Sequence, residues 1–300
     1  MKMIHTNSPE EAIAGIFGND LRIVSKRQVY GGDINQSYRL TLSDGSPVFM
    51  KSNTAKNLPF FGAEANGLEA LRQTGTIGVP QVIAMGSDKN TSFLLLEYLE
   101  AAPKLESYWE TFGRELASLH RADCSHLTAE GRFGFSEDNY IGATPQKNTP
   151  MWGWVDFFRE CRLMPQLRMA DRYFDSGTRR LCTKLTDHLD SYLTEPEFPS
   201  LLHGDLWSEN AAPGPDGKAW IFDPAAYVGH YEAELAMTEL FGRYPEGFYG
   251  AYSEINPIDS GYRDRRDLYN LYHLLNHLNL FGSSYLSSVK QILNRYAAKD

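Results

Sequence analysis

The residues best suited to chemistry lie in the segment LLHGDLWSENAAPGPDGKAWIFDP. Asp205 follows a His-Gly pair, Asn210 comes five positions later, and Asp223 ends the apolar run AWIF. Phosphoryl transfer needs a carboxylate that accepts the proton of an acceptor hydroxyl, and oxygen ligands that hold Mg²⁺ against nucleotide phosphates. An H-x-D-x-x-x-x-N loop followed by a strand-borne aspartate supplies these groups. The spacing therefore predicts Asp205 as catalytic base, with Asn210 and Asp223 as Mg²⁺ ligands.

A plainer interpretation of the same segment is a β-hairpin with Asp and Asn in its turn. Such residues are common in turns because their side chains bond to nearby backbone groups. Either half of the pattern alone favours the hairpin. The two halves together, at this spacing, favour phosphoryl transfer.

Lys51 ends a predicted strand, VFMKSN, and Glu64 lies on the predicted helix that follows it. A buried lysine needs an acidic partner or an anion. In a kinase, such a pair positions the lysine on the α- and β-phosphates of the nucleotide. Either residue alone would be interpreted as a surface charge, but their place upstream of the Asp205 loop favours the pair.

Two other segments are weaker candidates for nucleotide contacts. Gly31 and Gly32, between two predicted strands, could let backbone N–H groups approach phosphate. Their context, GGDINQS, is not a G-x-G-x-x-G motif, and most such pairs are plain turns. The strand FLLLEYLE ends at a connector whose free backbone groups could read the edge of adenine, or it is an ordinary buried strand.

The elements that must hold these residues divide the chain into two predicted lobes. Residues 1–97 contain short strands, an Asp44-Gly45 hairpin signal and one helix around Ala63–Leu71. Residues 98–300 contain mainly amphipathic helices, with a loop from Gly131 to Gly153 and an embedded strand pair, SLLHGD with AWIFDP. The predicted fold class is α+β: a small antiparallel β lobe that binds nucleotide, followed by a larger helical lobe that carries the catalytic loop and the acceptor site.

Composition limits the function classes. The chain has 300 residues and a formal net charge of −9, which offers no basic footprint for nucleic acid or an anionic membrane surface. Three cysteines without C-x-x-C spacing predict reduced thiols. No apolar h-region opens the chain and no run approaches about 18 apolar residues. We therefore expect a cytoplasmic protein, a monomer or weak homodimer, without nucleic-acid or membrane partners.

The segments described above resemble the fructosamine kinase, or ketosamine-3-kinase, family, within the aminoglycoside phosphotransferase and choline kinase-like group. The resemblance covers nearly the whole chain, from GGDINQSYRL through FGAEANGLEAL and GRELASLH to LLNHLNLFG. The HGDLW pentapeptide, the DNYIGATPQ loop and the DPAAYVGHYE segment are specific to this family. The resemblance implies a bilobal, protein-kinase-like fold.

Carried over residue by residue, the resemblance implies a role for each matching position. Lys51 would contact the ATP phosphates and pair with Glu64, and the backbone at Glu97 and Leu99 would hold adenine. Trp207 would form part of the sugar pocket. Four further residues would lie near the acceptor: Asp138, Asn139, Tyr140 and His277.

The resemblance also implies an activity. The family transfers the γ-phosphate of ATP, with Mg²⁺, to the 3-hydroxyl of a ketosamine, a sugar rearranged onto an amine such as a lysine side chain. The 3-phosphate breaks down and frees the amine, which deglycates proteins. The expected partners are therefore ATP and a small or protein-bound ribulosamine, erythrulosamine or fructosamine.

Two positions depart from relatives. Some relatives carry a cysteine in the glycine turn, where this chain has Asp33-Ile34, so a thiol switch is not expected there. Many kinase-like relatives have an aspartate where this chain has Glu234; we interpret the position as structural capping, so we do not expect the change to affect the chemistry.

Three other functions remain open from the sequence. The catalytic loop alone does not distinguish a ketosamine from an aminoglycoside, choline or homoserine as the acceptor. A non-catalytic kinase-like scaffold would be expected to lack one of Lys51, Asp205, Asn210 or Asp223, and all four are present. A metallohydrolase would use His203, Asp205 and His230, a thin ligand set.

Overall fold

The computed structural model describes residues 5–29, 35–128 and 131–297, which form two compact units. The first unit runs to Tyr108 and also takes in Ala211–Asp223. The second consists of Trp109–Asn210 and the chain from Pro224 on. The chain thus leaves the second unit after Asn210 and returns to it after Asp223. The division into functional lobes at residues 97 and 98 stays a prediction.

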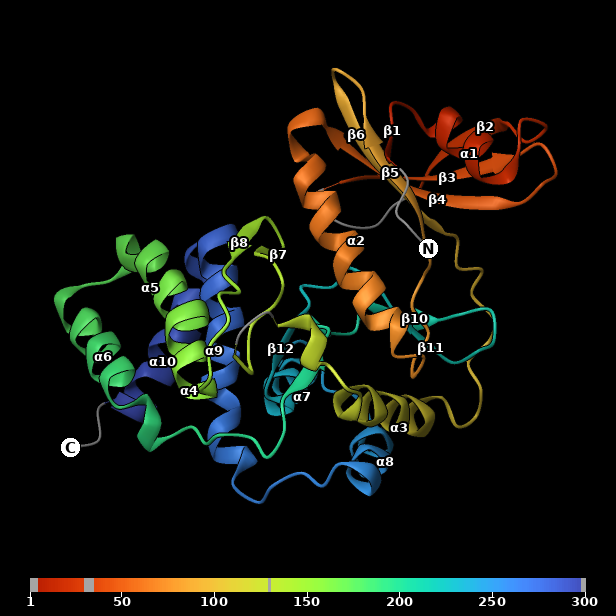
Figure 1. Ribbon diagram of the computed structural model, residues 1–300. Coiled ribbons are helices and arrows are strands. Elements are labelled where there is room, and N and C mark those ends of the chain that lie inside the picture. Colours follow the sequence, from red (N-terminus) through yellow and green to blue (C-terminus); the bar gives the residue numbers. More distant parts are fainter. Residues whose placement is uncertain (1–4, 30–34, 129–130, 298–300) are drawn as a thin grey trace. The chain divides into compact units, whose positions relative to one another are not determined.

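The first unit is built on a six-stranded sheet with the order β1-β5-β6-β4-β3-β2 (Figure 1). All neighbouring strands are antiparallel except β1 and β5. The predicted hairpin between β3 and β4 is confirmed, with Gly45 at φ 90° and Asp44 accepting a hydrogen bond from Ser46 N at 2.9 Å. The strands are β1 (His5–Thr6), β2 (Ile23–Val29), β3 (Gln36–Leu42), β4 (Pro47–Thr54), β5 (Val82–Ser87) and β6 (Thr91–Glu97).

Two helices accompany this sheet, α1 (Pro9–Phe17) and α2 (Leu58–Gln73), whereas the sequence predicted one. Ala12 and Ile13 of α1 share a buried core with Met50 and Leu95. Side chains alternate between the two faces of a strand, so Lys51, next to Met50, faces the other way and meets α2. The unpredicted α1 therefore helps to explain why consecutive residues of β4 are both buried.

The strand pairing around the catalytic segment differs from our prediction. SLLHGD was expected to pair with AWIFDP. Instead β9 (Ser200–Leu202) pairs with β12 (Tyr227–Gly229), and β10 (Ala211–Pro213) pairs with β11 (Ala219–Ile221). The β10–β11 hairpin belongs to the first unit, where Ile221 N donates to Gly78 O at 2.9 Å. A Cβ on Gly78 would lie 2.5 Å from the Trp220 ring, so only glycine permits this packing.

The second unit is mainly helical, as predicted (Figure 1). The long predicted helix after Gly153 is divided by a π-helical segment, Phe158–Leu163. The predicted loop from Gly131 to Gly153 contains a small hairpin, β7 (Asn139–Ile141) with β8 (Thr144–Gln146). The helices are α3 (Tyr108–Arg121), α4 (Trp154–Phe157), α5 (Met164–Ala170), α6 (Ser176–Asp187), α7 (Tyr231–Leu240), α8 (Glu246–Ile255), α9 (Tyr262–Phe281) and α10 (Leu286–Ala297).

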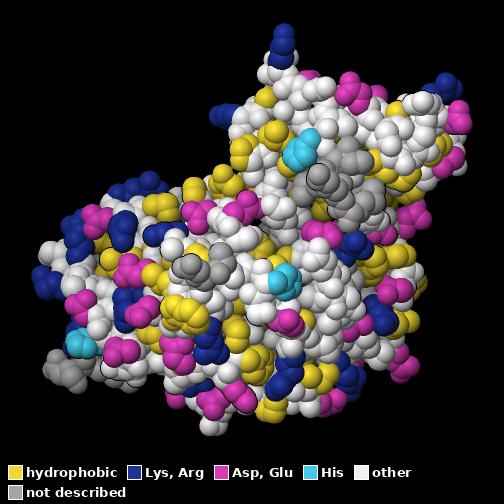
Figure 2. Space-filling model, viewed as in Figure 1, with side chains coloured by type: hydrophobic (Ala, Val, Ile, Leu, Met, Phe, Trp, Pro, Cys, Tyr) yellow, Lys and Arg dark blue, Asp and Glu magenta, His cyan; other side chains and the backbone are white. Residues whose placement is uncertain are grey.

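The surface carries acidic and basic side chains interspersed over the face shown in Figure 2. Within the described ranges, no helix has both the length and the apolar character needed to cross a membrane.

Candidate active site

Lys51 is the buried centre of an ion-pair cluster in the first unit. Its Nζ donates to Glu64 Oε1 at 2.7 Å and also contacts Asp223 Oδ1, which is 172 positions away in sequence. The side chains of Lys51 and Glu64 are 7% exposed and that of Asp223 is 40% exposed. Burial disfavours a charged lysine, but the Asp223 and Glu64 carboxylates outweigh it and raise the pKa of Lys51. Lys51 is therefore a fixed cation at physiological pH.

Asp223 has an unusual backbone conformation. Its φ is 59°, and among the residues with described backbone it is the one non-glycine residue with positive φ. Such conformations are uncommon for residues with a Cβ and concentrate at functional sites. Here the conformation occurs two residues after β11, where the chain carries the carboxylate to Lys51.

The predicted catalytic loop follows β9 in the second unit. Gly204 has φ 84°, and a Cβ there would lie 2.1 Å from Ala225 O, so only glycine permits this close approach. Asn210 Nδ2 donates to the backbone O of Asp205 at 2.8 Å and to its Oδ2 at 3.2 Å. These two bonds orient the Asp205 carboxylate and leave the Asn210 Oδ1 outside them. The structure thus joins Asp205 with Asn210 in one unit and Lys51, Glu64 and Asp223 in the other.

Glu234, on α7, holds the backbone of this loop. Its carboxylate accepts from His203 N and Gly204 N, each at 2.8 Å, and its Oε2 lies 3.3 Å from His120 Nε2. Burial alone would raise the pKa of Glu234, but the bonds from His120 and His203 lower it. The structural capping expected of Glu234 is made to the backbone of this loop, whereas His230 caps α7 through its own ring nitrogen. Only the acidic character of the position was visible in the sequence.

The loop Asp138–Tyr140 is braced by side-chain hydrogen bonds. Asn139 Nδ2 donates to Ala226 O at 2.7 Å, and its Oδ1 accepts from Gln146 Nε2 at 2.8 Å and Asn148 Nδ2 at 2.9 Å. Asp138 Oδ1 accepts from Asn148 N at 2.7 Å. Asn139 is buried, and both atoms of its side-chain amide are hydrogen-bonded within the protein. Asp138 is exposed and Tyr140 is partly exposed.

Trp207 and His277, which the resemblance assigned to the acceptor side, both contact Phe241. The ring centroids of Trp207 and Phe241 are 5.7 Å apart, and those of Phe241 and His277 are 4.6 Å apart. Phe241 was not predicted as a site residue. It directly follows α7, and nothing in its sequence context distinguishes it from a core aromatic residue.

Comparison with known proteins decides the family. The family model described as fructosamine kinase matches residues 5–299. A probable ketoamine kinase of Synechocystis sp. is 43% identical over 95% of this chain and 94% of its own length. The chain belongs to the fructosamine kinase family. Membership makes it a phosphotransferase with a hydroxyl acceptor, and confirms the resemblance inferred from the motifs.

Other relatives and solved structures are consistent with membership of this family and with its fold. A chloroplastic protein-ribulosamine 3-kinase of Arabidopsis thaliana is 40% identical over 93% of this chain and 84% of its own length. The crystal structure of a candidate fructosamine-3-kinase from Haemophilus somnus 129PT superimposes with a TM-score of 0.84, at 31% identity over 96% of both chains. Phosphotransferases at 13–15% identity share the fold alone. The protein-kinase-like fold class is thereby confirmed.

The remaining residues predicted to contact the nucleotide are Gly31, Gly32, Glu97 and Leu99. Gly31 and Gly32, with Asp33-Ile34, lie outside the described residues. Glu97 ends β6, and its N–H donates to Gln81 O at 2.9 Å. No described residue supplies a hydrogen-bond partner to the N–H of Leu99, two positions later.

The histidines of the alternative metallohydrolase have structural contacts in this fructosamine kinase fold. His230 is buried, its Nδ1 accepts from Glu232 N at 3.2 Å, and its ring packs on Trp154 and Tyr269. Burial lowers the pKa of His230 to about 3. His203 Nδ1 lies 3.3 Å from Asp205 N.

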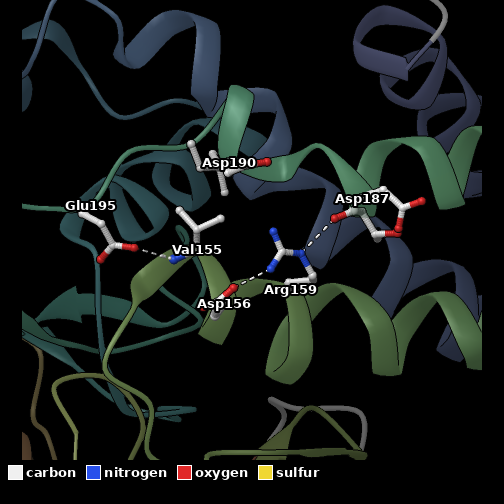
Figure 3. Close-up of a pocket in the computed structure, with 8 residues that line it drawn as sticks. Val155, Asp156, Arg159, Asp187, Asp190 and Glu195 are labelled. Atoms are coloured by element: carbon white, nitrogen blue, oxygen red, sulfur yellow. Dashed lines mark hydrogen bonds and ion pairs between the residues drawn. The ribbon is translucent and has the colours of Figure 1, made fainter.

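A groove of about 700 Å³ lies elsewhere in the second unit, between the segment that begins with α4 and the segment from the end of α6 to Glu195 (Figure 3). Glu195 accepts from Val155 N at 3.1 Å there, and Arg159 donates to Asp156 at 2.5 Å and to Thr186 O at 2.8 Å. None of the predicted site residues lines it. The lining residues are Val155, Asp156, Arg159, Thr186, Asp187, Asp190, Leu193 and Glu195.

The donor chemistry fits the cofactors that the kinase family implies. Asn210 Oδ1 and the Asp223 carboxylate are hard oxygen donors of the kind that Mg²⁺ prefers, and Mg²⁺ usually takes its other ligands from phosphates and water. Lys51 is a buried cation held by two carboxylates, and its pair with Glu64 matches the lysine–glutamate ion pair that positions the phosphate-binding lysine of protein kinases.

Proposed function

We propose that this chain is an ATP- and Mg²⁺-dependent kinase that phosphorylates the 3-hydroxyl of ketosamines. The observation that carries the proposal is the Lys51 cation shared between Glu64 and Asp223, in a member of the fructosamine kinase family. A relative at 40% identity is named a protein-ribulosamine 3-kinase. The acceptors we propose are ribulosamine, erythrulosamine or fructosamine adducts of amines.

The proposed reaction is an in-line displacement on the γ-phosphorus of ATP. Asp205 orients the 3-hydroxyl of the acceptor and takes its proton as that oxygen bonds to the γ-phosphorus. The bond from the γ-phosphorus to the β,γ-bridging oxygen breaks, and ADP leaves with that electron pair. Asn210 supports this role because its amide fixes both the backbone and the carboxylate of Asp205.

Lys51 and Glu64, both in the first unit, are assigned to the nucleotide. Lys51 would hold the α- and β-phosphates, with Glu64 fixing its ammonium group. Asp223 and the Asn210 oxygen would bind Mg²⁺, which when bound offsets the charge on the phosphate oxygens. The backbone of Glu97 and Leu99 would hold adenine, and an unpaired N–H on Leu99 among the described residues supports this assignment.

The acceptor side is assigned to the second unit. Trp207, two positions after Asp205, would stack on the sugar, since aromatic faces pack well against apolar sugar faces. Asp138 and Tyr140 would offer polar contacts, and His277 would line the same pocket through its contact with Phe241. Asn139 would act indirectly by bracing the loop against Ala226.

An acceptor panel tests the proposal. Purified full-length protein with Mg-ATP should phosphorylate ribulose-lysine, erythrulose-lysine or fructose-lysine, with the phosphate at the 3-position by ³¹P NMR. Choline, homoserine and an aminoglycoside should give only background ADP. Turnover of one of those and of no ketosamine would refute the assignment.

Asp205→Asn tests the catalytic base. The variant should lose at least about 100-fold in kcat, the range of general base contributions, while Mg-ATP still raises its Tm. Asp171→Asn is the matched control, since Asp171 is an exposed partner of Arg179. Wild-type turnover by Asp205→Asn would exclude the role.

A further inference from the structure

Five rings form a continuous aromatic cluster in the second unit: Trp207, Phe241, His277, Phe281 and Tyr285. Trp207 packs on Phe241, and Phe241 on His277. His277 in turn contacts Phe281, at a centroid distance of 5.4 Å, and Tyr285, at 5.2 Å. The cluster therefore begins two positions after Asp205 and ends at Phe281, whose side chain is 57% exposed.

Two helices end at this cluster. Phe241 directly follows α7, and Phe281 is the last residue of α9. The carbonyl groups of a helix C-terminus carry about half a negative charge, which lysine or arginine in the last turn commonly offsets. Arg172 donates to Asn279 O, in the last turn of α9, at 3.1 Å, whereas α7 has no basic residue in its last turn. The nearest following arginine in the sequence, Arg243, is bound by Glu239 at 3.2 Å and Glu246 at 2.7 Å.

His277 offers an acceptor at the centre of the cluster. Its Nδ1 lies 2.8 Å from the backbone O of His273. A carbonyl can only accept, so Nδ1 carries the proton and Nε2 of the neutral ring is an acceptor. Burial lowers the pKa of His277, which keeps the ring neutral at physiological pH.

Aromatic faces, the negative C-terminus of α7 and a neutral imidazole acceptor all favour one kind of ligand, an organic cation with an N–H donor. We propose that the aromatic cluster is a subsite for the protonated secondary amine of the acceptor and for the alkyl chain that this amine carries. The proposal rests on the proposed function, because a ketosamine differs from a free ketose by that ammonium group.

The positions of the rings indicate which part of the acceptor each ring would contact. Trp207 lies nearest the proposed base in sequence and would contact the sugar, whereas Phe241 and Tyr285 flank His277 and would contact the ammonium group. Phe281, exposed at the end of α9, would contact the alkyl chain where it reaches solvent. An exposed outer end leaves room for an amine that belongs to a protein.

Matched acceptors test the subsite by turnover. N-butyl ribulosamine carries the ammonium group, and the 1-O-butyl ether of ribulose replaces it with a neutral oxygen. Phe241→Leu and Tyr285→Leu should each lower kcat/KM for the amine by about 3- to 30-fold, the range of cation–π contacts, mainly through KM. The same variants should change kcat/KM for the ether by less than about twofold and leave the KM for ATP unchanged.

Two controls accompany these variants. Tyr285→Phe keeps the ring and removes only the hydroxyl, so it should retain wild-type selectivity for the amine. Phe17→Leu removes an exposed aromatic residue of α1 in the other unit and should change nothing. Equal losses on amine and ether, or no loss on the amine, would overturn the subsite.

A binding measurement separates this proposal from the proposed function. N-methylbutylammonium chloride, titrated by calorimetry into wild-type protein without sugar or ATP, should bind, and butyl methyl ether should not. Phe241→Leu should weaken the ammonium affinity by the same factor as its loss in kcat/KM. One result would support the subsite and refute the proposed kinase activity: no ketosamine is phosphorylated, but the ammonium ion binds to the wild type and binds more weakly to Phe241→Leu. Absence of ammonium binding to the wild type would overturn the subsite.

Discussion

Replacing Glu234 with glutamine should disturb the catalytic loop more than any local feature of α7 suggests. The carboxylate has no exposed surface, and each of its oxygens accepts one backbone N–H of the loop at 2.8 Å. Glutamine keeps one oxygen and turns an NH₂ donor toward the other N–H. One charge-assisted bond is lost, and one buried N–H faces another donor.

The size of the effect follows from these contacts. A hydrogen bond to a charged group contributes about 1.5–3 kcal/mol, and a buried donor left unsatisfied costs about 1–3 kcal/mol. The two contributions add to about 2.5–6 kcal/mol, and relaxation of the loop offsets part of them, so we expect the free energy of unfolding to fall by about 2–5 kcal/mol. Because the N–H groups belong to His203 and Gly204, next to Asp205, kcat should fall at least tenfold, equivalent to about 1.4 kcal/mol.

Urea unfolding followed by circular dichroism, with kcat measured on the same preparations, tests this reasoning. Glu254→Gln is the matched control, since Glu254 is an exposed partner of Arg114 and its loss should leave both quantities unchanged. Glu234→Asp keeps the charge, so it should retain more of both than the glutamine variant. The reasoning is refuted if Glu234→Gln unfolds within about 1 kcal/mol of the wild type and turns over at the wild-type rate.

Three further predictions concern charge. Lys51→Met should raise the KM for ATP and cost about 3 kcal/mol of unfolding free energy because Glu64 stays buried without its cation; an unchanged KM would contradict the assignment. EDTA should abolish the rise in Tm produced by ATP, and Mg²⁺ should restore it, whereas a rise that survives chelation would argue against metal-assisted binding. His230 and His273 have folded pKa values of about 3 against an ordinary value of 6.5, both because of burial. The unfolded chain therefore takes up protons first as the pH falls from about 6.5 toward 3, and stability present above that window is lost within it. Unfolding free energy should drop by about 2–3 kcal/mol between pH 7.5 and 5.5 in urea titrations, and His230→Asn should remove about half of that drop.

Local signals in the sequence anticipated many of the elements. The Asp44-Gly45 hairpin, the helix ending before Gly75 and the strands β5 and β6 all have patterns that depend on neighbouring residues. The catalytic motif is also local in sequence, because the H-x-D-x-x-x-x-N spacing brings Asp205 and Asn210 together within one short loop. That pattern, with the family-specific segments, was sufficient to identify the kinase family.

Strand pairing was decided by tertiary structure. SLLHGD, which contains β9, and AWIFDP, which contains β11, are both short apolar runs, and nothing in their composition shows that β9 pairs with β12 and β11 with β10. In the structure the β10–β11 hairpin packs in the first unit, where Trp220 lies against Gly78. Helix α1 was not predicted, and the burial of its Ala12 and Ile13 depends on a core to which four strands contribute.

Sequence alone determined which chemical groups this protein has, and the local geometry of Asp205 with Asn210, because those residues are joined by a few peptide bonds. Tertiary structure decided which distant groups meet. Lys51 contacts Asp223 across 172 positions, and Glu234 supports a loop 30 positions before it. Such pairs depend on how whole elements pack, since a side chain's partner across a fold is set by buried area and steric fit rather than by its neighbours in the chain.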